Sequence, residues 1–338
     1  MSRLTSIFLI ALFLNTGAGD ELSFPGGFAP ADPPTRSLVR LASSEKHLGK
    51  AHFVRVARSH GSLALFGGFG PADLQAQSPV GATDAERGAW VARQAEDRDT
   101  GRDARIAMRM KLFDRQGRVR ERALTVTSMR GGAGRPVAGD RSLVRFTYPN
   151  DIKGTSFLVW EQPGADDERF LYLPSLGRVR RIAGSEAQES FAGSDFTYED
   201  IGGREFENYT YRLIERTDSP VPPSWTAPDG TKYPVYQLES KSRDANARFP
   251  RVVSYVRKDN FVVVRAEIFS KRNELQKLFE AVRIEKVAGY WTTLEMRMSD
   301  SLERTRTELV LERVEYNIGL KPDDFSRREL ERGSGGRP

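Results

Sequence analysis

The sequence predicts a mainly β protein built on one large, curved antiparallel sheet. Segments that alternate apolar and charged residues recur from about residue 105 to residue 316. This two-residue alternation is the period of half-buried strands. Turn-forming residues separate these segments, and only one segment carries a clear helix signal. We count about ten or eleven strands, and a sheet of that size curls or closes on itself.

The N-terminus has the pattern of a secretory signal. Arg3 precedes a short apolar core, Leu4–Leu14, and small residues continue up to Ala18. The core is too short to span a bilayer, which needs about 20 residues. We therefore interpret residues 1–18 as a signal peptide and expect export to the periplasm.

Residues 19–82 alternate prolines and glycines with short apolar patches and show no sustained period. We expect an irregular or disordered leader there. A second leader-like pattern lies inside it, from Arg55 to Ser78, so translation could also start further downstream than Met1. A protein made from either start would export the downstream domain.

One helix and a hairpin open the domain that we expect over residues 83–332. Thr83 and Glu86 match a capping box, and Gly101 ends the helical pattern that runs to about Asp97. In the next strand Ile106, Met108, Met110 and Leu112 face one way and the charged residues the other. The chain returns over 118–129, and further strands are expected over 143–148 and 156–160.

A dense stretch, Asp167–Glu205, comes next. Its strand, Phe170–Leu173, stops at Pro174 and leads through a turn into the basic run 178–181. A Gly/Ser-rich segment then carries several aromatics and the pair Glu199-Asp200. With no nucleophile and base paired in it, we interpret the stretch as a strand that leads into a mobile lid near the mouth of the sheet.

The rest of the chain has the pattern of a regular meander. Its strands are expected over 209–214, 233–241, 252–257, 261–270, 277–287, 290–298 and 306–316, and a Pro-rich loop over 220–228. Lys321–Phe325 suits a turn that plugs one end of the sheet, and residues 333–338 form a tail.

Composition excludes several kinds of site. The chain has no cysteine, so it has no disulfide, thiolate metal site or cysteine nucleophile. Its three histidines, His47, His52 and His60, all precede the domain, which excludes a Ser-His-Asp triad or a His-ligated metal inside it. The net charge is +6, and basic and acidic residues are interspersed along the chain. This pattern fits a mixed-charge surface or mild attraction to an anionic membrane, and it is unlike the clustered basic residues of a nucleic-acid-binding protein.

The order of several motifs resembles the LolA-like outer-membrane lipoprotein-sorting family of bacterial periplasmic proteins. The resemblance spans about residues 84–332 and rests on Asp151–Leu158, Phe170–Pro174, Arg178–Ile182, Ser190–Asp200 and Lys321–Phe325. It implies an incomplete barrel, LolA/LolB-like, with a few helices covering the concave face. It also implies a carrier with an apolar cavity for acyl chains and no cofactor, metal or catalytic residue.

On that basis we expect a set of apolar side chains to line the acyl-chain cavity: Met108, Met110, Leu112, Phe157, Trp160, Tyr172, Phe191, Phe196, Val262, Val264, Ile268, Leu294 and Met296. Any one of them also fits an ordinary closed core. Phe191 and Phe196 are candidates to gate the cavity. Arg178, Arg180 and Arg181 are candidates to contact a headgroup, a membrane or a partner, or else form a solvated strand edge paired with Glu186 and Glu189.

Three functions remain open from the sequence. The first is a periplasmic carrier of lipid or lipoprotein acyl chains, with an inner-membrane transporter as donor and an outer-membrane acceptor. The second is a structural or adaptor subunit of an envelope export system with another hydrophobic cargo. A hydrolase is disfavoured, because the densest carboxylates, Asp166–Glu168, lie in a hydrophilic turn that does little to raise a carboxyl pKa.

Overall fold

The structure is a computed structural model and describes residues 81–214 and 224–332. These residues belong to one compact unit. The expected signal peptide, most of the leader and the tail lie outside the described residues. No described helix has the length and apolar character needed to cross a membrane.

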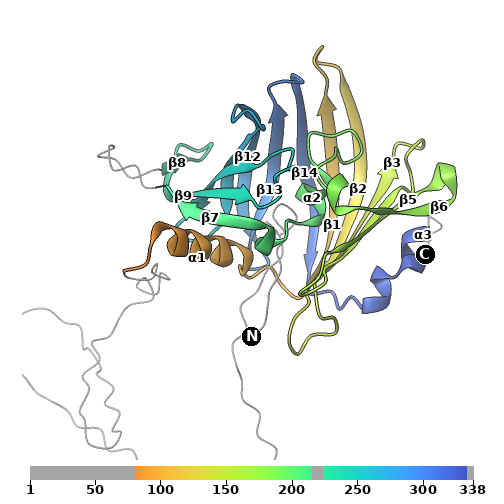
Figure 1. Cartoon of the computed structure of the whole chain (residues 1–338). Coiled ribbons are helices and arrows are strands. Elements are labelled where there is room, and N and C mark those ends of the chain that lie inside the picture. The colour runs from red at the N-terminus through yellow and green to blue at the C-terminus, as the bar shows by residue number, and fades with distance from the viewer. Residues whose placement is uncertain (1–80, 215–223, 333–338) are drawn as a thin grey trace, which may run out of the picture. The chain divides into compact units, whose positions relative to one another are not determined.

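One antiparallel sheet of 14 strands dominates the described chain, in the order β6-β5-β4-β3-β2-β1-β14-β13-β12-β11-β10-β9-β7, with β8 paired to β9 (Figure 1). It is open, because β6 and β7 are its two edges. The strands are β1 Asp103–Phe113, β2 Val119–Met129, β3 Arg141–Tyr148, β4 Ser156–Trp160, β5 Glu168–Leu173, β6 Arg178–Ile182, β7 Tyr209–Leu213, β8 Ser224–Thr226, β9 Lys232–Ser242, β10 Arg251–Arg257, β11 Val263–Phe269, β12 Leu275–Val287, β13 Tyr290–Asp300 and β14 Thr305–Tyr316. The predicted fold class is confirmed.

Helix α1, Asp84–Glu96, begins at the predicted capping box, where Thr83 and Glu86 cap each other. It packs against β7 and β9. Gly88 makes this approach possible, since a Cβ there would lie 2.6 Å from the Arg212 backbone. Trp90 packs edge-on against Phe261, with ring centroids 5.6 Å apart, and so fixes the other side of the helix.

Alternation along the strands builds two cores on opposite faces of the sheet. On β3 and β4, Val144 and Phe157 belong to the larger core, whereas Leu143 and Leu158 belong to a smaller one. We call the face with the larger core the concave face, since the chain connecting β6 to β7 and helix α2, Tyr198–Gly202, lie inside the curve of the sheet on that side (Figure 1).

The C-terminus covers the other, outer face. The predicted turn forms as a 3₁₀ helix, Pro322–Phe325, which leads into helix α3, Arg327–Glu331. Phe325 is buried against Leu158 and Phe170, and the Trp160 indole N–H donates to the Phe325 carbonyl at 2.7 Å. The turn therefore packs on the face of β3–β5, whereas the sequence suggested the end of the sheet.

Candidate functional site

The candidate site is the segment that joins the two edges of the open sheet. We call residues 183–208 the crossover, because they run from the end of β6 to the start of β7 across the concave face (Figure 1). Its apolar side chains, Phe191, Phe196, Tyr198 and Ile201, all belong to the larger core. The crossover thus fills the inside of the curve with part of the chain itself.

An aromatic cluster holds the middle of the crossover. The Phe191 ring stacks on Phe146 with centroids 5.7 Å apart and contacts Phe157 at the same separation. Tyr198 meets Phe191 edge-on at 5.6 Å and Phe157 at 5.2 Å. Only 1% of Phe191 and none of Phe196 is exposed, so this cluster excludes water from the centre of the concave face.

Polar contacts hold the tip of the crossover. We call Asp195 and its partners on β12 and β14 the latch. The Asp195 carboxylate accepts hydrogen bonds from the Thr305 and Thr307 hydroxyls, the latter at 2.7 Å, and Lys277 Nζ donates to the Asp195 carbonyl at 2.6 Å. Gly193, at φ +71°, gives the tight turn that aims the tip at the sheet.

A buried ion-pair network braces the far end of the crossover internally, and Tyr209 of β7 joins it. Arg204 lies 3.0 Å from both Glu199 and Asp200, and the Tyr209 hydroxyl donates to Glu199 at 2.7 Å. Burial raises the pKa of Glu199, and Arg204 opposes that rise. Burial alone would lower the pKa of Arg204, but Glu199, Tyr209 and Asp200 together outweigh it, and the pKa is raised. Arg204 is therefore a permanent cation inside the protein.

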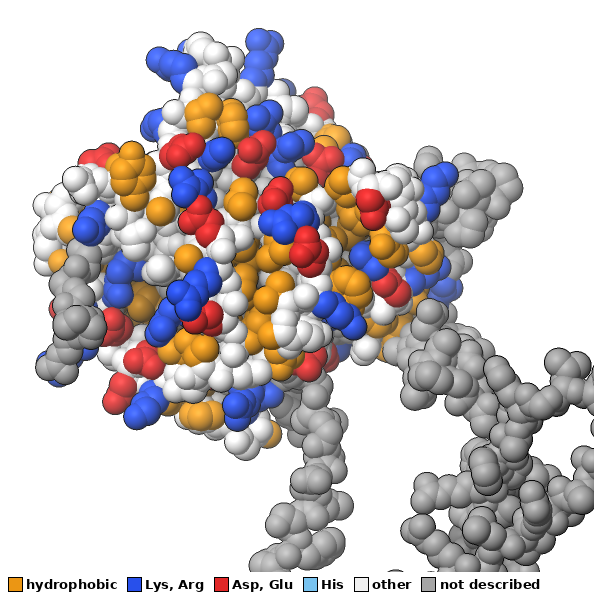
Figure 2. Space-filling model, turned by 180° about the vertical axis from the view of Figure 1, so that it is seen from behind, with side chains coloured by type: hydrophobic (Ala, Val, Ile, Leu, Met, Phe, Trp, Pro, Cys, Tyr) orange, Lys and Arg blue, Asp and Glu red, His pale blue; other side chains and the backbone are white. Residues whose placement is uncertain are grey.

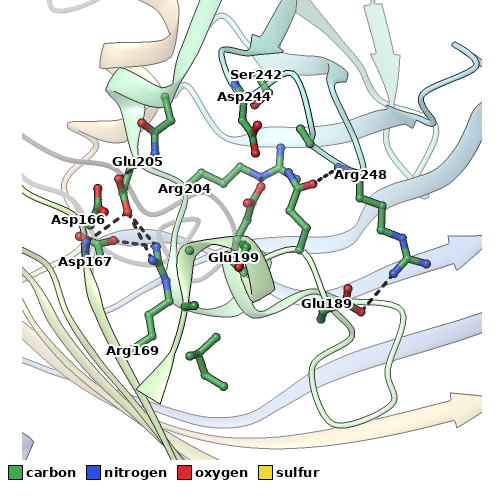
Figure 3. Close-up of a pocket in the computed structure, with 18 of the residues that line it drawn as sticks. Asp166, Asp167, Arg169, Glu189, Glu199, Arg204, Glu205, Ser242, Asp244 and Arg248 are labelled. Carbon is green, nitrogen blue, oxygen red and sulfur yellow. Dashed lines mark hydrogen bonds and ion pairs between the residues drawn. The ribbon is translucent and has the colours of Figure 1, made fainter. Parts of the chain in front are cut away.

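A second arginine ties this end to the sheet. Arg169 on β5 lies 3.0 Å from Asp167 and 3.4 Å from Glu205, and it also donates to the Gly203 carbonyl at 3.3 Å. Burial raises the pKa of Asp167 to about 7, against the opposing effect of Arg169. Figure 3 shows Arg169 pointing between Asp167 and Glu205.

These ion pairs form the wall of a polar cleft of about 710 Å³. The start of β5, the end of β6, the crossover and the loop between β9 and β10 line it, so the cleft lies where the sheet is open. Arg248, from that loop, is half-exposed and lies 3.6 Å from Glu189 of the crossover (Figure 3). The cleft can accept a charged group, while the concave face beside it is apolar.

A family model described only as an uncharacterized protein matches residues 138–332. The chain is also 30% identical to a DUF1329 family protein from Desulfovibrio piger, over 74% of this chain and 100% of that one, with a TM-score of 0.64. The chain belongs to the DUF1329 family.

Other solved structures extend the comparison of this DUF1329 protein. A domain from Vibrio parahaemolyticus, named for outer membrane lipoprotein sorting, is 27% identical over 73% of this chain and 100% of that one, with a TM-score of 0.64. A LolA superfamily protein from Nitrosomonas europaea is 17% identical over 73% and 100% of the two chains and has a TM-score of 0.53, which shows the fold alone. No curated protein sequence matches the chain. The resemblance seen in the sequence is confirmed.

In the structure of this chain, the residues expected to line a cavity are divided between the two faces of the sheet. Most of them share the larger core on the concave face: Met108, Met110, Leu112, Phe157, Phe191, Phe196, Val262, Val264, Ile268, Leu294 and Met296. Trp160 and Tyr172 pack with the smaller core on the outer face. The reason is the two-residue period, which puts Trp160 opposite Phe157 and Tyr172 opposite Leu171.

The three expected contact arginines lie exposed on edge strand β6. Arg180 lies 2.5 Å from Glu186, as the strand-edge alternative predicted, whereas Glu189 pairs with Arg248. Arg181 lies 3.8 Å from Glu168 and lines the polar cleft. The acidic pair Glu199-Asp200 is paired with Arg204.

Sequence reasoning missed the latch and Arg169. The sequence does contain a signal for the latch. Thr305 and Thr307 lie on the same face of β14 as Leu309 and Leu311, which are buried apolar residues. A polar pair that interrupts an inward apolar row needs a polar partner. The partner, Asp195, is more than 100 residues away, and no local pattern indicates it.

The raised pKa of Asp167 gives a testable pH dependence. The folded-state pKa of about 7 lies above the usual 3.8, so between these values the folded protein binds more protons than the unfolded chain. The free energy of unfolding should therefore fall as the pH rises from about 4 to about 7. Urea unfolding over this range should show a flatter profile for Asp167→Asn than for the wild type. Parallel profiles would contradict the assignment.

Proposed function

We propose that this protein is a periplasmic carrier that binds lipid or lipoprotein acyl chains on the concave face and hands them toward the outer membrane, without catalysis. The name of the Vibrio parahaemolyticus relative and the signal-like N-terminus both support this role. In this proposal residues 1–18 are the signal peptide and residues 83–332 are the binding domain.

The observation that carries the proposal is the way in which the concave face is covered. The cover is the crossover, a single segment that is attached through the latch at its tip and, at its far end, through the contacts of Arg169 with Glu205 and Gly203. Polar contacts of this kind can be exchanged for contacts with water when a segment moves. Displacing the crossover would expose a continuous apolar surface contributed by many strands of the sheet.

The energetics fit a carrier that releases cargo only to an acceptor. Burying one methylene is worth about 0.8 kcal/mol, so a long acyl chain gains on the order of 10 kcal/mol before costs. Part of that gain is spent on displacing Phe191 and Phe196 from the core. The remainder opposes escape into water, so cargo must pass directly between apolar surfaces.

The polar cleft supplies a place for the charged part of the cargo. Its exposed arginines, Arg181, Arg243 and Arg248, together with Arg178 and Arg180 on the neighbouring strand edge, suit a phosphate or carboxylate. We propose an inner-membrane transporter as donor and an outer-membrane acceptor, since both would keep the acyl chain out of water.

Lipid extraction and mass spectrometry of protein purified from the periplasm test the proposal. The carrier should release acyl lipids in a fixed ratio to protein. Folded protein that carries no lipid, and that takes up no fluorescent fatty acid in solution, would favour the adaptor role over the carrier.

A further inference from the structure

Six connections lie at one end of the sheet, of which five are hairpin turns and the sixth is the longer loop 243–250 between β9 and β10. The antiparallel register places the five turns at the same end of the sheet. They are the turns β1–β2, β3–β4, β5–β6, β11–β12 and β13–β14. We call them the hairpin rim, made of residues 114–120, 148–155, 174–178, 270–275 and 301–304.

The hairpin rim carries nearly all of the large apolar side chains that are exposed. The described residues have six of these, and five are on the rim, one at each turn: Leu176 and Leu302 in the turns themselves, and Val119, Tyr148 and Leu275 at the adjoining strand ends. They are 44–71% exposed, and the sixth, Ile318, is 38% exposed at the opposite end. Single exposed apolar residues are common on protein surfaces, but their confinement to one end is a pattern that needs a cause.

Basic side chains accompany these apolar tips. The rim holds eight Lys and Arg residues and four Asp and Glu residues, and each turn has at least one of the basic ones, all exposed. The described connections at the opposite end, 97–102, 130–140, 161–167, 258–262 and 317–321, hold six basic and seven acidic residues. In Figure 2, blue side chains surround the protruding top of the molecule, with orange ones close by.

We propose that the hairpin rim docks this protein onto an anionic lipid bilayer. The pairing of one apolar tip with a nearby cation in every turn matches the membrane interface, where apolar side chains enter the boundary with the acyl chains and cations reach lipid phosphates. The inference rests on the proposed function for its purpose, since a carrier must meet a bilayer to exchange cargo without water. The charge excess of the rim favours a lipid surface over an apolar protein groove.

Vesicle co-sedimentation of the full chain tests the docking. Vesicles rich in phosphatidylglycerol should bind the wild type, phosphatidylcholine vesicles should bind it more weakly, and added salt should reduce the binding. The double variants Leu176→Ser with Leu302→Ser, and Lys271→Ser with Arg272→Ser, should each lower vesicle affinity on the order of tenfold. The matched controls at the opposite end, Ile318→Ser and Arg102→Ser with Lys321→Ser, should bind like the wild type.

Equal binding to both kinds of vesicle, wild-type binding by the rim variants, or an equal loss in the controls would overturn the docking. Fatty-acid uptake in solution separates this result from the proposed function. The rim variants should take up fatty acid as the wild type does. A wild type that takes up none, yet binds vesicles through the rim, would remove the carrier role and leave the docking supported.

Discussion

Replacing Arg169 with alanine should destabilise the folded protein by about 3–5 kcal/mol. Arg169 is buried with Asp167 at 3.0 Å, and its second carboxylate partner, Glu205 at 3.4 Å, is partly buried. Removal of the cation leaves those charges in the protein interior with no compensation from water. Urea unfolding monitored by tryptophan fluorescence measures the change directly.

Arg181→Ala provides the control, because that side chain is mostly exposed and pairs with Glu168 at only 3.8 Å. An exposed ion pair is worth about 0–1 kcal/mol, so this variant should unfold nearly as the wild type does. Adding Asp167→Asn to Arg169→Ala should recover part of the loss by removing one of the stranded charges. An Arg169→Ala protein as stable as Arg181→Ala would show that the network does not hold the crossover.

Replacing Met108 with arginine should reduce fatty-acid uptake at least about 100-fold, because a charge on the concave face would have to be buried against an acyl chain. Met108 faces the larger core from the middle of β1 and is buried beside the other apolar positions of that strand. Titration with a fluorescent fatty acid measures the affinity.

Two further variants separate loss of binding from loss of folding. Arg109→Met changes the neighbouring residue, which lies on the exposed face of the same strand, and should leave uptake unchanged. Met108→Gln introduces a polar group of similar size and should give an intermediate loss. Circular dichroism on each variant verifies the fold, and unchanged uptake by a folded Met108→Arg protein would place the cargo away from this face.

The strands could be predicted because their signal is local. Ile106, Met108, Met110 and Leu112 alternate with Arg105, Ala107, Arg109 and Lys111, and the structure buries all four apolar residues. Strand β6 carried no such alternation, and its position at the open edge depends on the whole topology. Strand β8 is three residues long and lies in a segment that has the composition of a Pro-rich loop.

Helices α2 and α3 are five residues each, too short to show a helical period. Both nevertheless begin at a residue that caps them, Thr197 and Ser326, with an acidic residue three positions later. A cap without a helical period after it is a weak signal, so neither helix was predicted. Most of the concave face could be predicted, whereas Trp160 and Tyr172 fall on the other face because the two-residue period places them there.

The site itself depended on contacts between distant residues. Arg169 and Glu205 are 36 residues apart, and Asp195 and Thr307 are 112 apart. A single sequence does not indicate which polar residues will meet across a folded sheet. The crossover could be identified as unusual from its aromatics and glycines, but its course over the concave face depends on the positions of β6 and β7 at the two edges.

In the proposed carrier, cargo enters only when the crossover leaves the concave face. A disulfide that pins the tip tests it, since the chain has no cysteine to interfere. Asp195 and Thr307 are the pair to replace, because the Thr307 hydroxyl contacts both the Asp195 carboxylate at 2.7 Å and the Asp195 backbone N–H at 3.0 Å. Fatty-acid uptake by Asp195→Cys with Thr307→Cys should be lost in the oxidised protein and should return on reduction. Equal uptake by the oxidised and reduced forms would contradict the claim.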